Sequence, residues 1–196
     1  RRHLLLTVEA DQALVESRLM GGRVACPGCG TSLCPWGWAR PRGVWGLAGR
    51  LRPRRARCRG CGVTHVLLPV TVLLRRAYAV EVIGAAVVAR AGGAGHRRIA
   101  EGLGVPAATV RGWLRRMASR LEATRGHLWQ VVVRAGVDRP VPKARGCSWR
   151  DLLACLGAAT AAVTSRFGLV GVLGPVTVWQ VAVACSGGRL LAPGWP

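Results

Sequence analysis

The motif Cys26-Pro27-Gly28-Cys29-Gly30 returns in the same form as Cys58-Arg59-Gly60-Cys61-Gly62, which gives the spacing C-x2-C-x28-C-x2-C. In each copy, a glycine after the second cysteine permits the positive φ of a tight turn, so that both thiolates face one point. Two such turns place four sulfurs in a tetrahedron, which suits a structural Zn²⁺. We therefore expect one structural zinc per chain, with the metal ligands Cys26, Cys29, Cys58 and Cys61.

Two other interpretations of these cysteines stay open. A rubredoxin-like iron site uses nearly the same spacing, and the pairs can also arise by chance. Rubredoxin-like electron carriers are usually acidic, whereas the loop between the motifs carries seven arginines and no acid. Cys34 and His65 lie close enough in sequence to be alternate ligands, but we interpret them as ordinary loop and strand residues. Because protein fills all four positions, the metal should fold the module and leave no place for a catalytic water.

The charge of the chain indicates a polyanionic partner. Lys and Arg number 29 against 8 Asp and Glu, which gives a net charge of +21, and the 51% of hydrophobic residues exclude a disordered basic tail. Residues 17–75 contain eleven arginines and no acid, and residues 76–125 have a net charge of +6. Nucleic acid is the leading partner, and an acidic membrane surface is the second.

Periodicity predicts the organisation of the chain. We expect strands over 3–8, 37–45, 50–57 and 64–68, and helices over 9–20, 78–90, 149–164 and 176–184, besides two helices within 96–121. The fold class is then mainly α with a small β zinc ribbon. Its order is an N-terminal strand–helix (1–22), the zinc ribbon (23–75), a three-helix helix-turn-helix domain (76–125), a linker (126–147) and a C-terminal helical region (148–196).

The segment from His96 to Met117 carries the helix-turn-helix pattern. Ile99 and the small Ala100 lie on the apolar face of a short helix, Gly104 permits a left-handed turn, and Val105 fills the corner. The apolar positions of the next helix recur at helical spacing, at Val110, Trp113, Leu114, Met117 and Leu121. A plain helical hairpin is the alternative.

The second of these helices is the expected recognition helix. Only Arg111 near its start has the reach and the donors for a guanine edge, while Ala107 and Ala108 can touch thymine methyl groups. Gly112 lies on the same exposed face. The residues expected to contact phosphates are Arg97, Arg98, Thr109, Arg115 and Arg116. We expect strong binding to double-stranded DNA with modest specificity.

Three tryptophans lie among the arginines of the ribbon, at Trp36, Trp38 and Trp45. Aromatic residues interleaved with bases can stack on a single strand. We favour the alternative that they fill the thin core of the ribbon.

Both modules together resemble the N-terminal DNA-binding part of insertion-sequence transposases, through the pattern I-A-x-x-L-G-V-x-x-x-T-V-x-x-W-L-R-R at 99–116. More closely, the chain is similar to an uncharacterised actinobacterial family, often carried with mobile elements, that combines a zinc ribbon with a helix-turn-helix. The match covers nearly the whole chain and is carried by residues 34–42, 52–69, 95–100 and 187–193. The resemblance implies DNA binding, with the four cysteines as metal ligands and Arg111 in the groove-reading helix.

Catalysis is not expected. Transposases of that kind hold two metal ions with three carboxylates, whereas only Asp138 and Asp151 follow the helix-turn-helix here. We expect a mobile-element-associated regulator of transcription or a targeting subunit, as a homodimer or with a transposase partner. The alternatives are a truncated or split transposase and a zinc-dependent protein-interaction module.

The location of the protein also follows from its apolar segments. The apolar run at residues 4–6 is too short for a secretory signal, and the uncharged segment 167–185 is interrupted by glycines and Pro175. We expect no membrane association and a cytoplasmic, nucleoid-associated protein.

Overall fold

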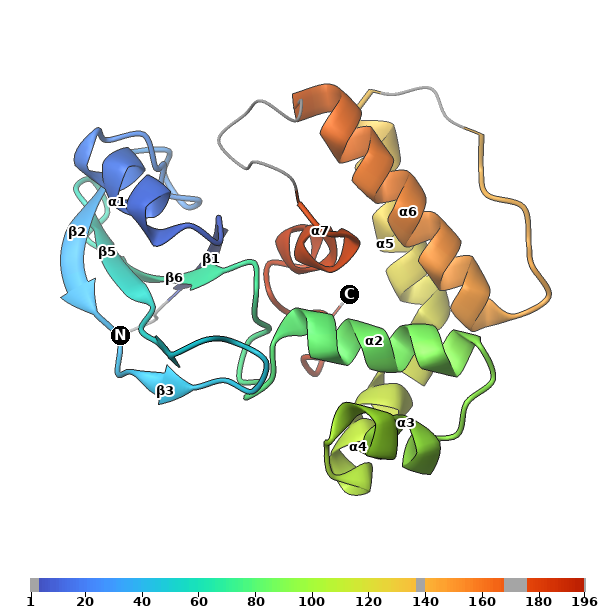
Figure 1. Cartoon of the computed structure of the whole chain (residues 1–196). Helices are drawn as coiled ribbons and strands as arrows, with labels where there is room; N and C mark the ends of the chain where they lie inside the picture. Colours follow the sequence, from blue (N-terminus) through green and yellow to red (C-terminus); the bar gives the residue numbers. More distant parts are fainter. Residues whose placement is uncertain (1–3, 137–139, 168–175, 196) are drawn as a thin grey trace.

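A computed structural model describes residues 4–136, 140–167 and 176–195. The described residues form seven helices and six short strands. A sheet with α1 (Gln12–Met20) lies at one side of the molecule, and the other six helices gather at the other side (Figure 1). The expected combination of helices with a small cysteine-bearing β module is therefore present.

The four-stranded sheet has the order β1-β6-β5-β2. Its strands are β1 (Leu4–Val8), β2 (Leu33–Trp38), β5 (Arg54–Cys58) and β6 (Thr64–Pro69). β1 runs parallel to β6, and the other two pairings are antiparallel. The expected boundary after residue 22 does not separate two units, because β1 completes the sheet and Val15 and Leu19 of α1 pack into its core. A ribbon of 23–75 alone would leave one edge of β6 unpaired.

The expected long strands 37–45 and 50–57 are each interrupted. In place of the strand 37–45, the structure has the end of β2 and the short strand β3 (Arg42–Gly43). In place of the strand 50–57, it has β4 (Arg50–Leu51) and β5. β3 and β4 pair with each other in a separate two-stranded sheet. Pro41 and Pro53 stand at the breaks. Proline lacks the N–H that a strand interior donates, which explains why pairing stops there.

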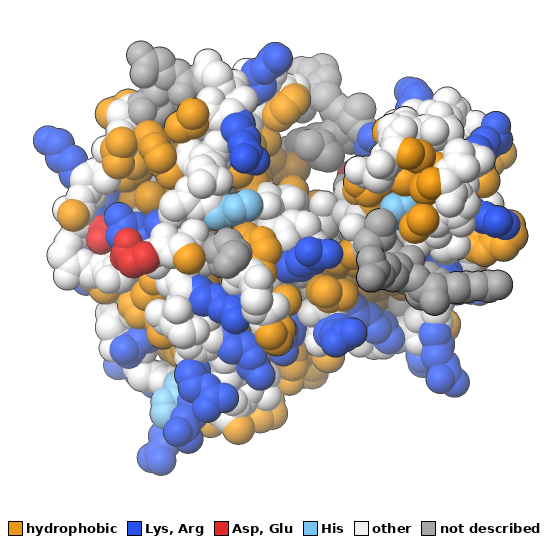
Figure 2. All heavy atoms as spheres, turned by 180° about the vertical axis from the view of Figure 1, so that it is seen from behind, with side chains coloured by type: hydrophobic (Ala, Val, Ile, Leu, Met, Phe, Trp, Pro, Cys, Tyr) orange, Lys and Arg blue, Asp and Glu red, His pale blue; other side chains and the backbone are white. Residues whose placement is uncertain are grey.

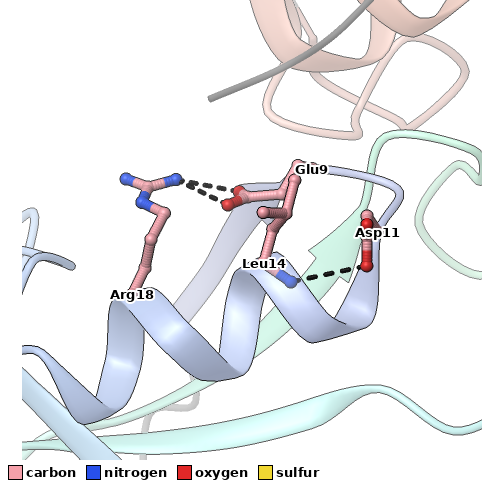
Figure 3. A network of polar contacts seen from close by, with 4 residues as sticks. All are labelled: Glu9, Asp11, Leu14 and Arg18. Atoms are coloured by element: carbon pink, nitrogen blue, oxygen red, sulfur yellow. Dashed lines mark hydrogen bonds and ion pairs between the residues drawn. The ribbon is translucent and has the colours of Figure 1, made fainter. Parts of the chain in front are cut away.

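Helix α1 begins three residues later than the sequence suggested. The Asp11 side chain accepts hydrogen bonds from the backbone N–H groups of Ala13 and Leu14 and so caps the helix. Figure 3 shows the contact with Leu14. Glu9 precedes the cap, and both of its carboxylate oxygens accept from Arg18 Nη1, at 3.0 and 2.8 Å. Because Glu9 is only 4% exposed, this ion pair neutralises a buried carboxylate.

The helical part contains α2 (Val80–Ala91), α3 (His96–Leu103), α4 (Ala107–Ala118), α5 (Leu121–Arg134), α6 (Ser148–Phe167) and α7 (Val178–Cys185). These six helices share one apolar core. α5 and α6 lie side by side along most of their length (Figure 1).

Two expectations about the helices are wrong. Residues 126–134 of the expected linker are helical, because Leu128 and Val132 of α5 are buried in the shared core. Gly126 occupies a helical position with open space around it. Leu121 belongs to α5 and not to α4. The helical backbone is interrupted between them at Arg120, whose φ is −140°.

None of the described helices combines the length and the apolarity that crossing a bilayer requires. Residues 168–175 of the uncharged segment 167–185 lie outside the described residues.

Candidate metal centre and nucleic-acid interface

The four cysteines of the two motifs come together in one cluster. Their Sγ atoms all lie within 4.8 Å of one another, with 3.3 Å between Cys29 and Cys58 and 3.8 Å between Cys26 and Cys61. Four sulfurs bound to Zn²⁺ at about 2.3 Å form a tetrahedron with edges of about 3.8 Å. The cysteines are free thiols, not disulfides. The cluster therefore has the size and the donors to hold a metal ion.

Each motif folds into the same turn. The backbone N–H of Gly30 donates to the carbonyl of the first cysteine in its motif at 2.9 Å, and Gly62 does the same in the second motif at 3.2 Å. Both glycines have the positive φ that the sequence suggested, 74° and 70°. A further backbone N–H in each turn, from Gly28 and from Cys61, donates to a ligand sulfur at 3.4 Å. These amide–sulfur contacts favour the thiolate form that a metal requires.

Burial of the cluster is uneven. Cys26 and Cys58 are buried and belong to the apolar core between the sheet and α1, whereas Cys29 and Cys61 face solvent. One cysteine of each turn is thus part of the core of this module, so a bound ion would connect both turns directly to that core.

His65, which the sequence analysis considered as an alternate ligand and set aside as an ordinary strand residue, lies beside the cluster. It lies on β6, is fully buried at 0% exposure, and places Nε2 at 3.4 Å from Cys26 Sγ. Burial lowers the pKa of His65, so the neutral ring can donate its Nε2–H to the thiolate. Strand pairing places it there, because β6 runs beside β5, which ends at Cys58. In the sequence, its closeness to the second motif was a signal that it shared with Cys34.

The two exposed thiols of the cluster differ in pKa. Hydrogen bonds from Thr31 lower the pKa of Cys29 to about 6. The Val63 N–H would lower the pKa of Cys61 as well, but the neighbouring cysteine sulfurs outweigh it and raise that pKa to about 11. Four thiolates so close together repel one another, and a divalent cation removes this repulsion.

The residues expected to contact DNA lie on two adjoining helices. Arg97 and Arg98 are exposed on α3, and Thr109 and Gly112 of α4 are half-buried. The exposed members on α4 are Ala107, Ala108, Arg111, Arg115 and Arg116. Arg116 Nη1 donates to the Gly112 carbonyl at 3.1 Å, so this side chain lies back along its own helix. Basic side chains gather over α3 and α4 at the lower end of the molecule in Figure 2.

The packing of these helices follows the sequence pattern. Gly104 ends α3 in the left-handed conformation, with φ 61° and ψ 34°, and Val105 in the corner is buried. Val110, Trp113, Leu114 and Met117 form the buried face of α4. α2 contacts both α3 and α4, and Tyr78 before α2 packs edge-on against Trp113 at 4.9 Å between ring centroids.

The tryptophans of the sheet module do not fill its core as we favoured. Trp36 and Trp45 are 53% and 57% exposed. Arg57 lies over the Trp36 ring at 4.8 Å, and Arg54 over the Trp38 ring at 4.5 Å. The core is instead filled by aliphatic residues, including those of α1, β2 and β6, and the Trp36 and Trp38 rings stack with arginines.

No protein-family model, curated protein or solved structure matches this chain.

Proposed function

We propose that this chain is a non-catalytic protein that binds double-stranded DNA through a helix-turn-helix formed by α2, α3 and α4. One observation carries the proposal. α3 and α4 bury their apolar faces around the left-handed Gly104, while five arginines of the same two helices face solvent: Arg97, Arg98, Arg111, Arg115 and Arg116. A second helix held at a fixed angle with a basic outer surface is what insertion into a major groove requires.

We further propose that the cluster holds one structural Zn²⁺. Four cysteine sulfurs form a closed site, and thiolates prefer zinc or iron–sulfur chemistry over hard cations. The intervening strands carry arginines and no acid, which favours a partner of negative charge over the role of an acidic electron carrier. The zinc would fold the sheet module, since two of the ligands lie in its core.

The roles of the side chains differ within this interface. Arg111 stands in the first turns of α4, where recognition helices touch base edges. Ala107, Ala108 and Gly112 let the helix approach the groove floor closely, with room for a thymine methyl group. The other contacts, from Arg97, Arg98, Thr109, Arg115 and Arg116, would go to phosphates and supply affinity without sequence information.

In the cell, such a protein would act on the nucleoid as a regulator or a targeting subunit of a mobile element, as a homodimer or beside a transposase. A truncated or split transposase is the second candidate. Asp151, one of the two acids after residue 125, is buried and accepts a hydrogen bond from the Arg145 N–H at 2.6 Å, which gives it a structural role. Asp138 lies outside the described residues. A zinc-dependent protein-interaction module is the third candidate, and it predicts little affinity for DNA.

The test is binding of duplex DNA by the purified chain over a range of salt concentrations, with footprinting and with and without a chelator. A protein with a net charge of +21 that contacts several phosphates should still bind at about 0.1 M salt. Absence of binding there would exclude both DNA-binding candidates and leave the interaction module. Metal analysis of the same sample should find one zinc per chain, and iron would contradict the zinc assignment.

Two variants test how α4 would dock. Arg111→Ala should relax sequence preference at one position, at a cost of about 1–3 kcal/mol for the preferred base. Arg115→Ala should weaken binding to all sequences alike and reduce the salt dependence by about one unit of slope. Identical behaviour of the two variants would show that the assignment of Arg111 to a base is wrong.

A further inference from the structure

A cavity lined by arginines opens between the sheet module and the C-terminal segment. Its volume is about 470 Å³, and its lining includes Leu74, Arg75, Arg76, Arg189 and Trp195. No acidic residue lines it, and none of the ion pairs among the described residues involves these arginines. Three guanidinium groups around one cavity repel one another unless an anion lies between them.

Hydrogen bonds hold the C-terminal segment that lines the cavity. Arg76 Nη2 donates to the Leu191 carbonyl at 2.7 Å, and Arg120 Nη1 donates to the Trp195 carbonyl, also at 2.7 Å. The backbone N–H of Leu74 donates to the Gly188 carbonyl at 2.8 Å. The segment after α7 is thereby tied to both halves of the molecule, so the cavity does not depend on one loose loop.

One polar atom of this wall is unsatisfied. Arg76 Nε is buried and has no hydrogen-bond partner among the described residues. A buried donor without a partner is costly, so Arg76 is held in this wall at an expense in free energy. Burial lowers the pKa of Arg76, and the charge of Arg116 lowers it further, so Arg116 at the end of α4 is close to this wall.

Two arginines that line the cavity, Arg75 and Arg189, make no side-chain hydrogen bond or ion pair among the described residues. Both are exposed. Arg75 is also the single non-glycine residue with positive φ in the described part of the chain, at 57°. Glycine would adopt this backbone at lower cost than arginine does.

From these observations we propose that the cavity is a phosphate-binding site, in which Arg75, Arg76 and Arg189 surround one phosphate group. Guanidinium groups suit this ligand because their planar donors match phosphate oxygens in pairs. The group can be a backbone phosphate of DNA bound at α4 or a free phosphate. The first source rests on the proposed function, whereas the site itself does not.

The first measurement is the melting temperature of the zinc-loaded protein in inorganic phosphate and in chloride at equal ionic strength. Phosphate should raise the melting temperature of the wild type in a saturable manner, because it binds the folded state only. Arg75→Gly and Arg189→Gln should lose this shift. Arg134→Gln, which removes an exposed arginine at the end of α5, should keep it and so control for charge and for general salt effects.

Arg75→Gly also separates binding from folding. Since glycine tolerates positive φ, this variant should melt in chloride at or above the wild-type temperature while losing the phosphate shift. A shift equal to that of the wild type in both Arg75→Gly and Arg189→Gln, or no shift in the wild type, would overturn the proposal.

The second measurement identifies the source of the phosphate. If it belongs to DNA, Arg189→Gln should lower the slope of log K against log salt by about one and Arg134→Gln should not. If the slope is unchanged while the phosphate shift is lost, the site takes a free phosphate. Failure of the wild type to bind DNA would refute the proposed function alone, since the melting measurement tests the site without DNA.

Discussion

His65 shows how a single side chain outside the motifs can support the cysteine cluster. Its Nε2 lies 3.4 Å from Cys26 Sγ, and its other ring nitrogen is buried without a partner among the described residues. A donor to a ligand sulfur stabilises the thiolate and orients it toward the metal. We expect His65→Leu to lower zinc affinity about 10- to 100-fold, as measured by competition with a chromophoric chelator.

The control for this variant is Cys34→Ser. Cys34 is a cysteine near the cluster, but its Sγ contacts the Arg57 carbonyl instead of the other sulfurs. The substitution should leave zinc affinity unchanged. Equal affinities for His65→Leu and the wild type would mean that the histidine only fills space.

The Glu9–Arg18 ion pair gives a second prediction for single residues. Glu9 is buried, and Arg18 neutralises it through one nitrogen that contacts both oxygens. Arg18→Met would leave the carboxylate buried without its cation and should cost about 3–5 kcal/mol in the free energy of unfolding, as measured with urea. Arg134→Met, at an exposed arginine, should change it by less than about 0.5 kcal/mol. A loss below about 1 kcal/mol for Arg18→Met would show that water reaches Glu9.

At the scale of elements, α2 and α7 meet at a contact that tolerates only glycine. A Cβ added at Gly84 would lie 2.2 Å from the Trp179 ring, a distance at which the two helices must separate. Gly84→Ala should therefore destabilise the protein by about 1–3 kcal/mol or more through overpacking. Gly126→Ala in α5 meets nothing within 4 Å and should stabilise it by about 0.5–1 kcal/mol. Thermal unfolding of both variants checks the pair, and stabilisation of both would contradict this packing.

The glycines of this protein also show which features can be predicted from the sequence. Turn glycines such as Gly30, Gly62 and Gly104 were predictable, because cysteine spacing and helical periodicity define the turn around them. Gly84 and Gly126 carry no such local pattern, and only the neighbour across the core distinguishes them. For the same reason the cysteine cluster was predicted from its spacing, whereas α5 was mistaken for a linker and His65 for an ordinary strand residue.

At the scale of the whole molecule, the sheet with α1 and the six other helices have separate apolar cores, and only the first core contains clustered cysteines. The core between the sheet and α1 includes Cys26 and Cys58, whereas the core of α2 to α7 contains none of the four clustered cysteines. With so few apolar residues, the small sheet module is expected to need a metal for stability. The helical body has its own core of buried residues, so we expect it to stay folded without a metal.

Chelation should therefore unfold the sheet module and leave the helical body folded. Circular dichroism at 222 nm should keep most of its amplitude, because six of the seven described helices lie outside the sheet module. Fluorescence of the tryptophans on β2, Trp36 and Trp38, should change, since their stacking with Arg57 and Arg54 ends. If DNA binds through α4, affinity should fall in the chelated protein while the preference associated with Arg111 persists. Cooperative loss of all helical signal on chelation would show instead that contacts such as Leu74 N–H to Gly188 join the bodies into one folding unit.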